Sequence, residues 1–113
     1  MRTLVIAALA LMVSAAGTDA WQKGQKERKP VTHTVTVDAT GFSPASLTIT
    51  AGDSVLWVNK DLIPHTATSK KAGVFDSGAI AAGRSWKQTM KTKGELPYVC
   101  QFHPTMKGTL IVK

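Results

Sequence analysis

Three side chains able to bind a metal lie within seven residues of one another near the end of the chain. Cys100, His103 and Met106 form the motif C-x-x-H-x-x-M, and Pro104 directly follows the histidine. A thiolate, an imidazole and a thioether together favour copper, because calcium, magnesium and manganese prefer oxygen ligands. A thioether is also a poor zinc ligand, which argues against a structural zinc site. The spacing predicts that the three side chains turn from one loop toward a single copper ion.

His65 is the available fourth donor. It follows Pro64 at the start of a predicted strand, and proline restricts the backbone that leads to the imidazole. Taken singly, each of the four residues has a simpler interpretation, such as a surface histidine, a small buried cysteine or a methionine that fills a gap in the core. Taken together, they favour a metal site with one copper ion.

The first twenty residues have the layout of a secretory signal peptide. Arg2 precedes an apolar run over residues 4–13, and small residues follow at 14–17. The run is too short to span a bilayer, which needs about 20 residues. We expect cleavage after Ala16 or Ala20 and export to the periplasm, and the alternative is an uncleaved anchor. Cys100 is the single cysteine, so an exported chain could form no internal disulfide, and a bound metal would occupy its thiol.

Length and charge limit the classes of function. A chain of 113 residues suits one domain, which we place at residues 31–113. Residues 21–30 form a basic polar leader that we expect to be solvated. The net charge of +7 favours acidic partner surfaces or anionic headgroups. Because no aromatic stacking platform accompanies the basic residues, nucleic-acid binding is not expected.

From Val31 onward, short apolar alternations are separated by glycine, proline and aspartate, and this pattern predicts an all-β domain. Close spacing of the strands favours a two-sheet sandwich with Greek-key connections. Pro97 falls inside one predicted strand and is placed on an edge or at a bulge, because it cannot donate a ladder hydrogen bond. The predicted strands cover residues 32–38, 47–50, 54–59, 66–70, 84–90, 96–100 and 108–112.

The chain from Val31 to Lys113 resembles the cupredoxins, the blue copper family, and most of all its amicyanin, plastocyanin and pseudoazurin branch. The resemblance rests on F-S-P-A-S-L-T-I-T-A-G-D-S-V-L-W-V-N before His65, on F-D-S-G in the middle, and on G-E-L-P-Y-V-C-Q-F-H-P-T-M-K-G-T-L-I-V at the end. The two-residue gap between His103 and Met106 is similar to that of amicyanin. The resemblance implies a Greek-key β-sandwich of about eight strands.

The resemblance also implies roles for single residues. Nitrogen atoms of His65 and His103 and the sulfur of Cys100 would bind copper in a plane, with Met106 as a weak axial ligand. Asn59 matches the family position whose side chain ties the ligand loops together. Two positions depart from the pattern: Gln101 replaces the usual serine or threonine after the cysteine, and Leu96 stands at an aromatic position.

The function implied by the resemblance is transfer of single electrons between redox proteins through Cu(II)/Cu(I), without enzymatic activity, by a monomer. Lys60 or Lys107 could steer acidic partners at long range. The alternative is copper delivery or buffering. A copper enzyme needs more histidines, and beyond the two predicted ligands the chain has only His33, which we expect to face solvent. Partners are expected to dock around His103, on Ile63, Pro64, Phe102 and Pro104.

Overall fold

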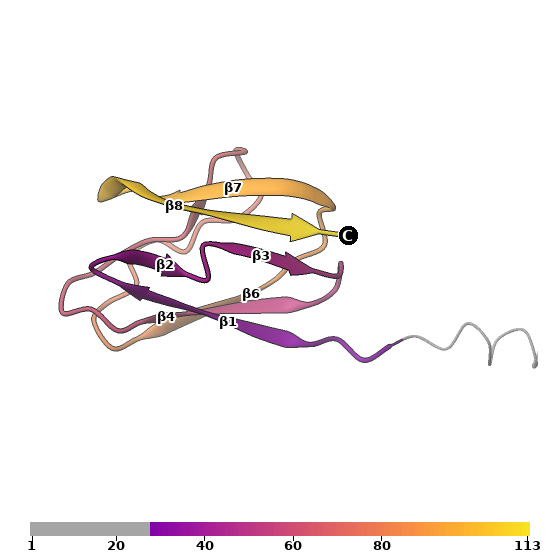
Figure 1. Ribbon diagram of the computed structural model, residues 1–113, viewed down its shortest axis with the longest axis horizontal. Helices are drawn as coiled ribbons and strands as arrows, with labels where there is room; N and C mark the ends of the chain where they lie inside the picture. The colour runs from indigo at the N-terminus through magenta and orange to yellow at the C-terminus, as the bar shows by residue number, and fades with distance from the viewer. Residues whose placement is uncertain (1–27) are drawn as a thin grey trace, which may run out of the picture.

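The computed structural model describes residues 28–113. The predicted signal peptide, with its cleavage sites at Ala16 and Ala20, and residues 21–27 of the leader lie outside the described residues. The described chain forms eight β-strands in two sheets that pack face to face (Figure 1). The strands are β1 (Thr32–Asp38), β2 (Gly41–Ser43), β3 (Ser46–Ile49), β4 (Ser54–Asn59), β5 (Thr68–Ser69), β6 (Ser85–Thr89), β7 (Gly94–Cys100) and β8 (His103–Val112).

The two sheets each contain four strands, in the orders β2-β1-β4-β6 and β3-β8-β7-β5. Both are mixed, because β1 runs parallel to β4 and β3 runs parallel to β8, whereas the other neighbours are antiparallel. The predicted all-β sandwich of about eight strands is therefore confirmed. Within residues 28–113, no helix is long and apolar enough to span a membrane.

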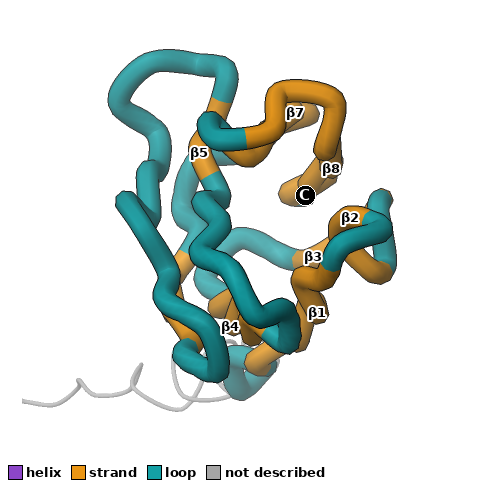
Figure 2. The backbone as a smooth tube through the Cα atoms, turned by 90° about the vertical axis from the view of Figure 1, so that its left-hand side faces the viewer, coloured by secondary structure: helices purple, strands orange, loops and turns teal. Residues whose placement is uncertain are grey.

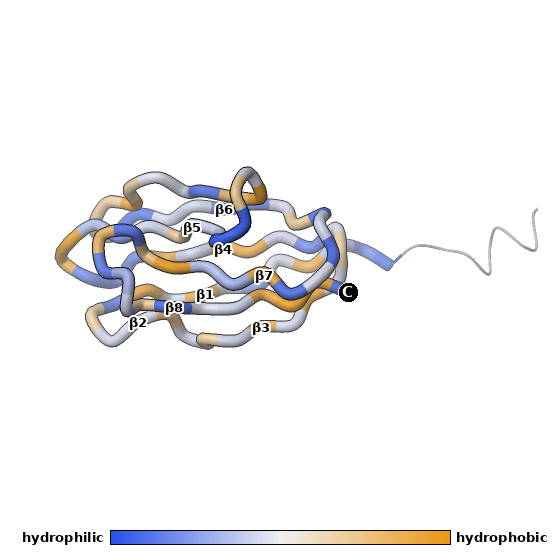
Figure 3. The backbone as a smooth tube through the Cα atoms, turned by 90° about the horizontal axis from the view of Figure 1, so that it is seen from above, coloured by the Kyte–Doolittle hydropathy of each residue, from blue (hydrophilic) through white to orange (hydrophobic). Residues whose placement is uncertain are grey.

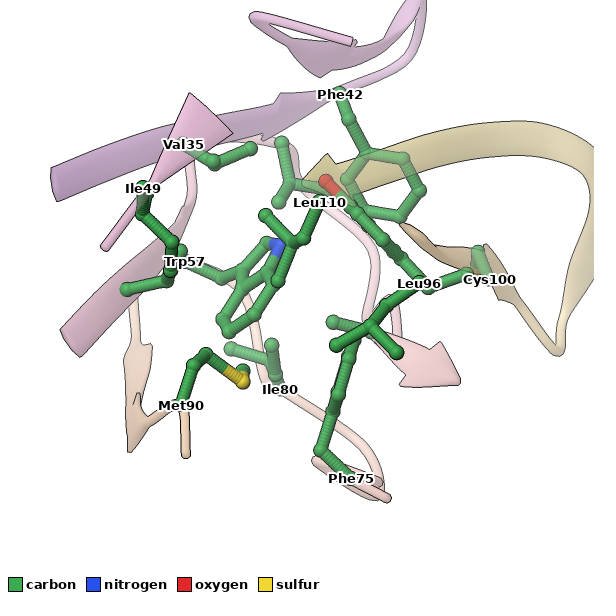
Figure 4. Close-up of a cluster of buried hydrophobic side chains, with 14 of the residues drawn as sticks. Val35, Phe42, Ile49, Trp57, Phe75, Ile80, Met90, Leu96, Cys100 and Leu110 are labelled. Atoms are coloured by element: carbon green, nitrogen blue, oxygen red, sulfur yellow. The ribbon is translucent and has the colours of Figure 1, made fainter. Parts of the chain in front are cut away.

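Alternating apolar residues build the core between the sheets. Val35 and Val37 of β1 are fully buried, and so are Leu96 of β7 and Leu110 of β8, because every second side chain of a strand points to the same face. Trp57 of β4 lies in the middle of this cluster, surrounded by side chains from both sheets (Figure 4). The core thus fixes the strands whose ends carry the predicted metal ligands.

The sandwich has two distinct ends. The start of β1 and the C-terminus lie at one end, and the turn from β7 to β8 lies at the other (Figure 1). Viewed from the latter side, loops cross the end of the sandwich (Figure 2). Hydrophobic segments also occur in these loops, away from the C-terminus (Figure 3).

The predicted strand bounds agree with the structure for some strands and differ for others. β1 and β4 have the predicted bounds, whereas β5 has only two residues, Thr68 and Ser69. β2 was not predicted. β8 begins at His103 rather than at Gly108, so the last part of the predicted ligand loop is strand.

Pro97 lies in β7, which has β8 on one side and β5 on the other, so its predicted place on an edge or at a bulge is wrong. The register shift falls between Val99 and Cys100 instead. The carbonyl of Pro97 accepts a hydrogen bond from Lys70 N over 2.9 Å, so its backbone polar groups face away from β8. The missing N–H of Pro97 therefore removes no bond from the β7 to β8 ladder, and on its other side β5 has already ended at Ser69.

A buried carboxylate, Asp53, organises the end of the sandwich that carries the start of β1. Its side chain accepts hydrogen bonds from Val31 N over 3.0 Å and from His33 Nε2 over 2.9 Å, and it pairs with Arg28 over 3.0 Å. His33 is therefore partly buried and bonded to Asp53, so the prediction that it faces solvent is wrong. The predicted solvated leader also makes contact with the domain at Arg28.

Candidate metal centre

Cys100 reaches the site through the alternation of β7. Leu96, Tyr98 and Cys100 all point inward, and β7 ends at the cysteine, so the thiol lies where the apolar core meets the end of the sandwich. The side chain is fully buried. Its sulfur is therefore shielded from bulk water by the surrounding side chains.

His103 lies opposite Cys100 in a tight hairpin. Gln101 and Phe102 form the turn, and Cys100 pairs with His103 in the β7 to β8 ladder. This pairing places His103 Nδ1 3.8 Å from Cys100 Sγ. A hairpin therefore brings the first two residues of the motif together, where we predicted a loop.

Met106 is brought inward by β8. It shares the inner face of this strand with Leu110 and Val112, and it is 9% exposed. Together with His65 and His103, it lines a cavity of 280 Å³ at this end of the molecule. The structure therefore places Met106 beside both histidines.

His65 comes from the other side of the site. Its backbone forms an isolated bridge with Ile80, in which Ile80 N donates to His65 O over 2.7 Å and His65 N donates to Ile80 O over 3.2 Å. The imidazole is almost fully buried, and its Nδ1 lies 3.7 Å from Cys100 Sγ. The bridge thus holds the ring over the thiol.

The three donors converge closely enough for one ion. One potential ligand atom from each of His65, Cys100 and His103 lies within 4.8 Å of the other two, and the two imidazole centroids are 5.2 Å apart. Two imidazoles and a thiolate beside a thioether are a donor set that suits copper. The residues present therefore fit a copper ion on their chemistry and on their geometry.

Asn59 connects two segments around His65, the loop that precedes it and the segment of Ile80, and none of its side-chain hydrogen bonds goes to residues 100–106. Its Nδ2 donates to the carbonyls of Ile63 and Ile80, each over 2.9 Å, and its Oδ1 accepts from Asp61 N over 2.9 Å. The side chain is fully buried. Asn59 therefore holds both the loop that precedes His65 and Ile80, the bridge partner of His65.

The missing serine or threonine after the cysteine is offset by Thr66. The backbone N–H of Gln101 donates to Thr66 Oγ1 over 2.8 Å, and Thr66 N donates to Cys100 Sγ over 3.3 Å. Because Gln101 contributes its backbone, its side-chain type matters little to this link. Sequence reasoning missed Thr66, and its place directly after His65 was the only signal.

Asp61 was also missed. Its Oδ2 lies 2.7 Å from His65 Nε2, and because a carboxylate accepts, the imidazole donates from Nε2. This tautomer leaves the lone pair on Nδ1, which faces Cys100. The signal available in the sequence was a carboxylate four residues before the histidine.

The surroundings of the thiol favour its charged form. Burial raises the pKa of Cys100, but the hydrogen bond from Thr66 N–H and the nearby rings of His65 and His103 outweigh it and lower the pKa to about 6. A thiolate is the form that binds metals. The folded chain therefore carries Cys100 largely as a thiolate at neutral pH, ready to bind a metal.

Apolar side chains surround the site on the surface. The four residues predicted for docking, Ile63, Pro64, Phe102 and Pro104, are all exposed. The structure adds Leu62, which is 91% exposed and was not predicted.

Comparisons with known proteins agree with this geometry. The family model described as "Cupredoxin-like domain" matches residues 3–112. The amicyanin of Paracoccus versutus is 30% identical over 123 residues, covering 96% of this chain and 92% of that protein. The chloroplastic plastocyanin of Tetradesmus obliquus is 34% identical over 90 residues, covering 64% of this chain and 58% of that protein. A solved structure of a purple cupredoxin from Nitrosopumilus maritimus superposes with a TM-score of 0.67 at 26% identity, covering 72% of this chain and 99% of the other.

Proposed function

Because this chain belongs to the cupredoxin-like family, in its amicyanin and plastocyanin branch, we propose that it shuttles single electrons between redox proteins in the periplasm. Members of this branch hold one copper ion and act as electron carriers and not as enzymes, and the same holds for this chain. We further propose which residues bind the copper ion, where redox partners dock, that the protein is exported to the periplasm, and that it is a monomer.

We assign copper binding to His65, Cys100, His103 and Met106. The single observation that carries this assignment is the convergence of two imidazole Nδ1 atoms on Cys100 Sγ, at 3.7 and 3.8 Å. Met106 contributes a thioether from the same cavity. Bound copper supplies the change of one electron.

The protein contributes rigidity to this site. His65 is fixed by its bridge to Ile80, and Cys100 is fixed by the N–H of Thr66 and by the ladder pair with His103. Donors that are already held need little rearrangement when the charge of the site changes. Fast electron transfer follows from this small rearrangement.

Partners would approach the half-buried His103. Ile63, Pro64, Phe102 and Pro104 give an apolar surface that can be desolvated on contact, and the exposed Lys60 and Lys107 attract acidic partners. Replacing Phe102 by alanine should slow electron exchange with a partner while the visible spectrum stays unchanged.

The test is the visible spectrum after Cu(II) is added to the purified protein. We expect an intense thiolate band that bleaches with ascorbate and returns on oxidation. Cys100→Ala should abolish the band and the reversible voltammetry, whereas His33→Ala, at the other end of the sandwich, should retain both. Colour and reversible voltammetry in Cys100→Ala would overturn the ligand assignment.

Copper exchange tests the shuttle against copper delivery. Because His65 and Cys100 are buried, we expect slow loss of copper to a competing chelator in both oxidation states. Rapid transfer to the chelator would favour delivery.

Export and oligomeric state are tested on the protein recovered from a periplasmic fraction. The mass should correspond to cleavage after Ala16 or Ala20, and sedimentation should give the mass of one chain. A full-length mass would contradict cleavage.

A further inference from the structure

A carboxylate contacts one of the proposed copper ligands on the side remote from the thiol. Asp61 Oδ2 lies 2.7 Å from His65 Nε2, and His65 Nδ1 faces Cys100 Sγ over 3.7 Å. Asp61, His65 and Cys100 therefore form a line in which the imidazole separates the carboxylate from the sulfur.

The position of Asp61 is set by its own backbone and by its neighbours. Asp61 N donates to Asn59 Oδ1 over 2.9 Å, and Asp61 Oδ1 accepts from Leu62 N over 2.7 Å. The Asp61 side chain is 16% exposed and that of His65 is 2% exposed. One carboxylate oxygen is thus used to hold the turn, and the other remains for the imidazole.

This arrangement has two physical consequences for His65. Donation from Nε2 fixes the tautomer, so Nδ1 keeps its lone pair for a metal, and the carboxylate makes the imidazole a stronger electron donor. The negative charge, largely shielded from water, also stabilises a more positive metal ion relative to a less positive one. Both effects favour Cu(II) over Cu(I).

We propose that Asp61 is a positioning residue for His65 that lowers the reduction potential of the copper site. The inference rests on the proposed role of His65 as a ligand. It deepens the proposed function because the potential decides which redox proteins can donate electrons to this chain and which can accept them.

The experiment is voltammetry of the copper-loaded protein at one fixed pH, comparing wild type with Asp61→Asn. Asparagine keeps the shape and can still accept from Nε2, but it carries no charge. We expect the ratio of Cu(II) to Cu(I) affinity to fall about tenfold, which corresponds to a rise in potential of ~59 mV for a one-electron couple. Asp61→Glu keeps the charge and should return the potential part of the way to that of wild type.

Asp38→Asn is the matched control. Asp38 lies at the same end of the sandwich, next to Ala39, which lines the cavity shared by Asp61 and His65. Its carboxylate accepts from Thr40 N and Thr40 Oγ1, over 2.8 and 2.6 Å, and makes no hydrogen bond to His65. Asp38→Asn removes one charge without touching the imidazole, so its shift should be clearly smaller.

A second readout follows His65 itself. In proton NMR of the Cu(I) protein, the Nε2 proton of His65 should exchange slowly in wild type, and should exchange faster in Asp61→Ala. Equal potentials for Asp61→Asn and Asp38→Asn, or an unchanged Nε2 proton in Asp61→Ala, would overturn the inference. If wild type shows no reversible couple at all, the proposed electron transfer fails instead, so the two failures are distinguishable.

Discussion

The backbone N–H of Thr66 donates a hydrogen bond to Cys100 Sγ over 3.3 Å, although 34 residues separate them. Thr66 directly follows His65, so the segment that carries one imidazole also contacts the sulfur. Its hydroxyl accepts from Gln101 N over 2.8 Å, on the other side of the cysteine. The two segments that supply the proposed ligands are therefore joined before any metal binds.

This contact predicts an acidic thiol in the copper-free protein. Burial raises the pKa of Cys100, but the N–H of Thr66 and the rings of His65 and His103 lower the pKa to about 6. We expect the ultraviolet absorbance of the thiolate to titrate with a midpoint near pH 6. His103→Ala should raise the midpoint and His33→Ala should leave it unchanged; a midpoint near the model-compound value of 9.0 in the unmutated protein would contradict the prediction.

A second prediction concerns Gly108, which lies under the ring of Tyr98. A Cβ atom at Gly108 would lie 2.3 Å from Tyr98 Cζ, so the ring would have to move within a packed core. We expect Gly108→Ala to lower the free energy of unfolding by about 1–3 kcal/mol, measured with denaturant. Lys107→Ala, at the exposed neighbouring position, should have little effect. If the clash is the cause, the loss should be smaller when Gly108→Ala is made in a Tyr98→Leu background.

The sequence predicted best what depends on alternation and on donor chemistry. β1 and β4 were predicted with their bounds because apolar side chains that are buried alternate with more exposed residues along most of each strand. β2 has three residues, and β5 has two, which is too short for alternation to be visible. His65, Cys100, His103 and Met106 could be found because their side-chain types are informative by themselves.

The contacts around these residues could not be predicted in the same way. Thr66 and Gln101 act partly through backbone N–H groups, which every residue except proline carries. Asp61 reaches His65 only because a turn held by Asn59 directs it there. His33 and Asp53 are 20 residues apart, and only the parallel pairing of β1 with β4 brings their segments together.

A third prediction concerns the hydroxyl of Tyr98. Among the described residues, neither this oxygen nor Trp57 Nε1 makes a hydrogen bond of good geometry, although both are buried and the indole N–H lies near enough to oppose the rise in the pKa of Tyr98. Burial raises the pKa of Tyr98 to about 12. Because an unsatisfied buried hydroxyl is costly, Tyr98→Phe should leave the free energy of unfolding unchanged or raise it by about 1 kcal/mol. Tyr98→Leu, which also loses the packed ring, should destabilise the fold, and a comparable loss in Tyr98→Phe would indicate a bonded hydroxyl.

The last prediction concerns acid stability and Asp53. Hydrogen bonds from Arg28, His33 and Val31 N lower the pKa of Asp53 well below its usual value of 3.8, and they outweigh the opposing effect of burial. The folded state therefore holds the ionised carboxylate more strongly than the unfolded state does. This stabilisation is complete above about pH 4 and is lost as the pH falls toward the lowered pKa.

Asp53→Asn tests this dependence, because it keeps the shape of the side chain and removes its titration. We expect the variant to be less stable than wild type at pH 7, and the difference to shrink as denaturant unfolding is repeated at lower pH. His33→Ala should remove part of the difference, because it deletes one of the four side-chain and backbone donors. Arg28→Ala should also remove part of it, because Arg28 contacts both oxygens of the buried carboxylate, through Nη1 over 3.0 Å and Nη2 over 3.2 Å. A difference between wild type and Asp53→Asn that stays constant down to about pH 2 would show that the charge of Asp53 does not stabilise this end of the sandwich.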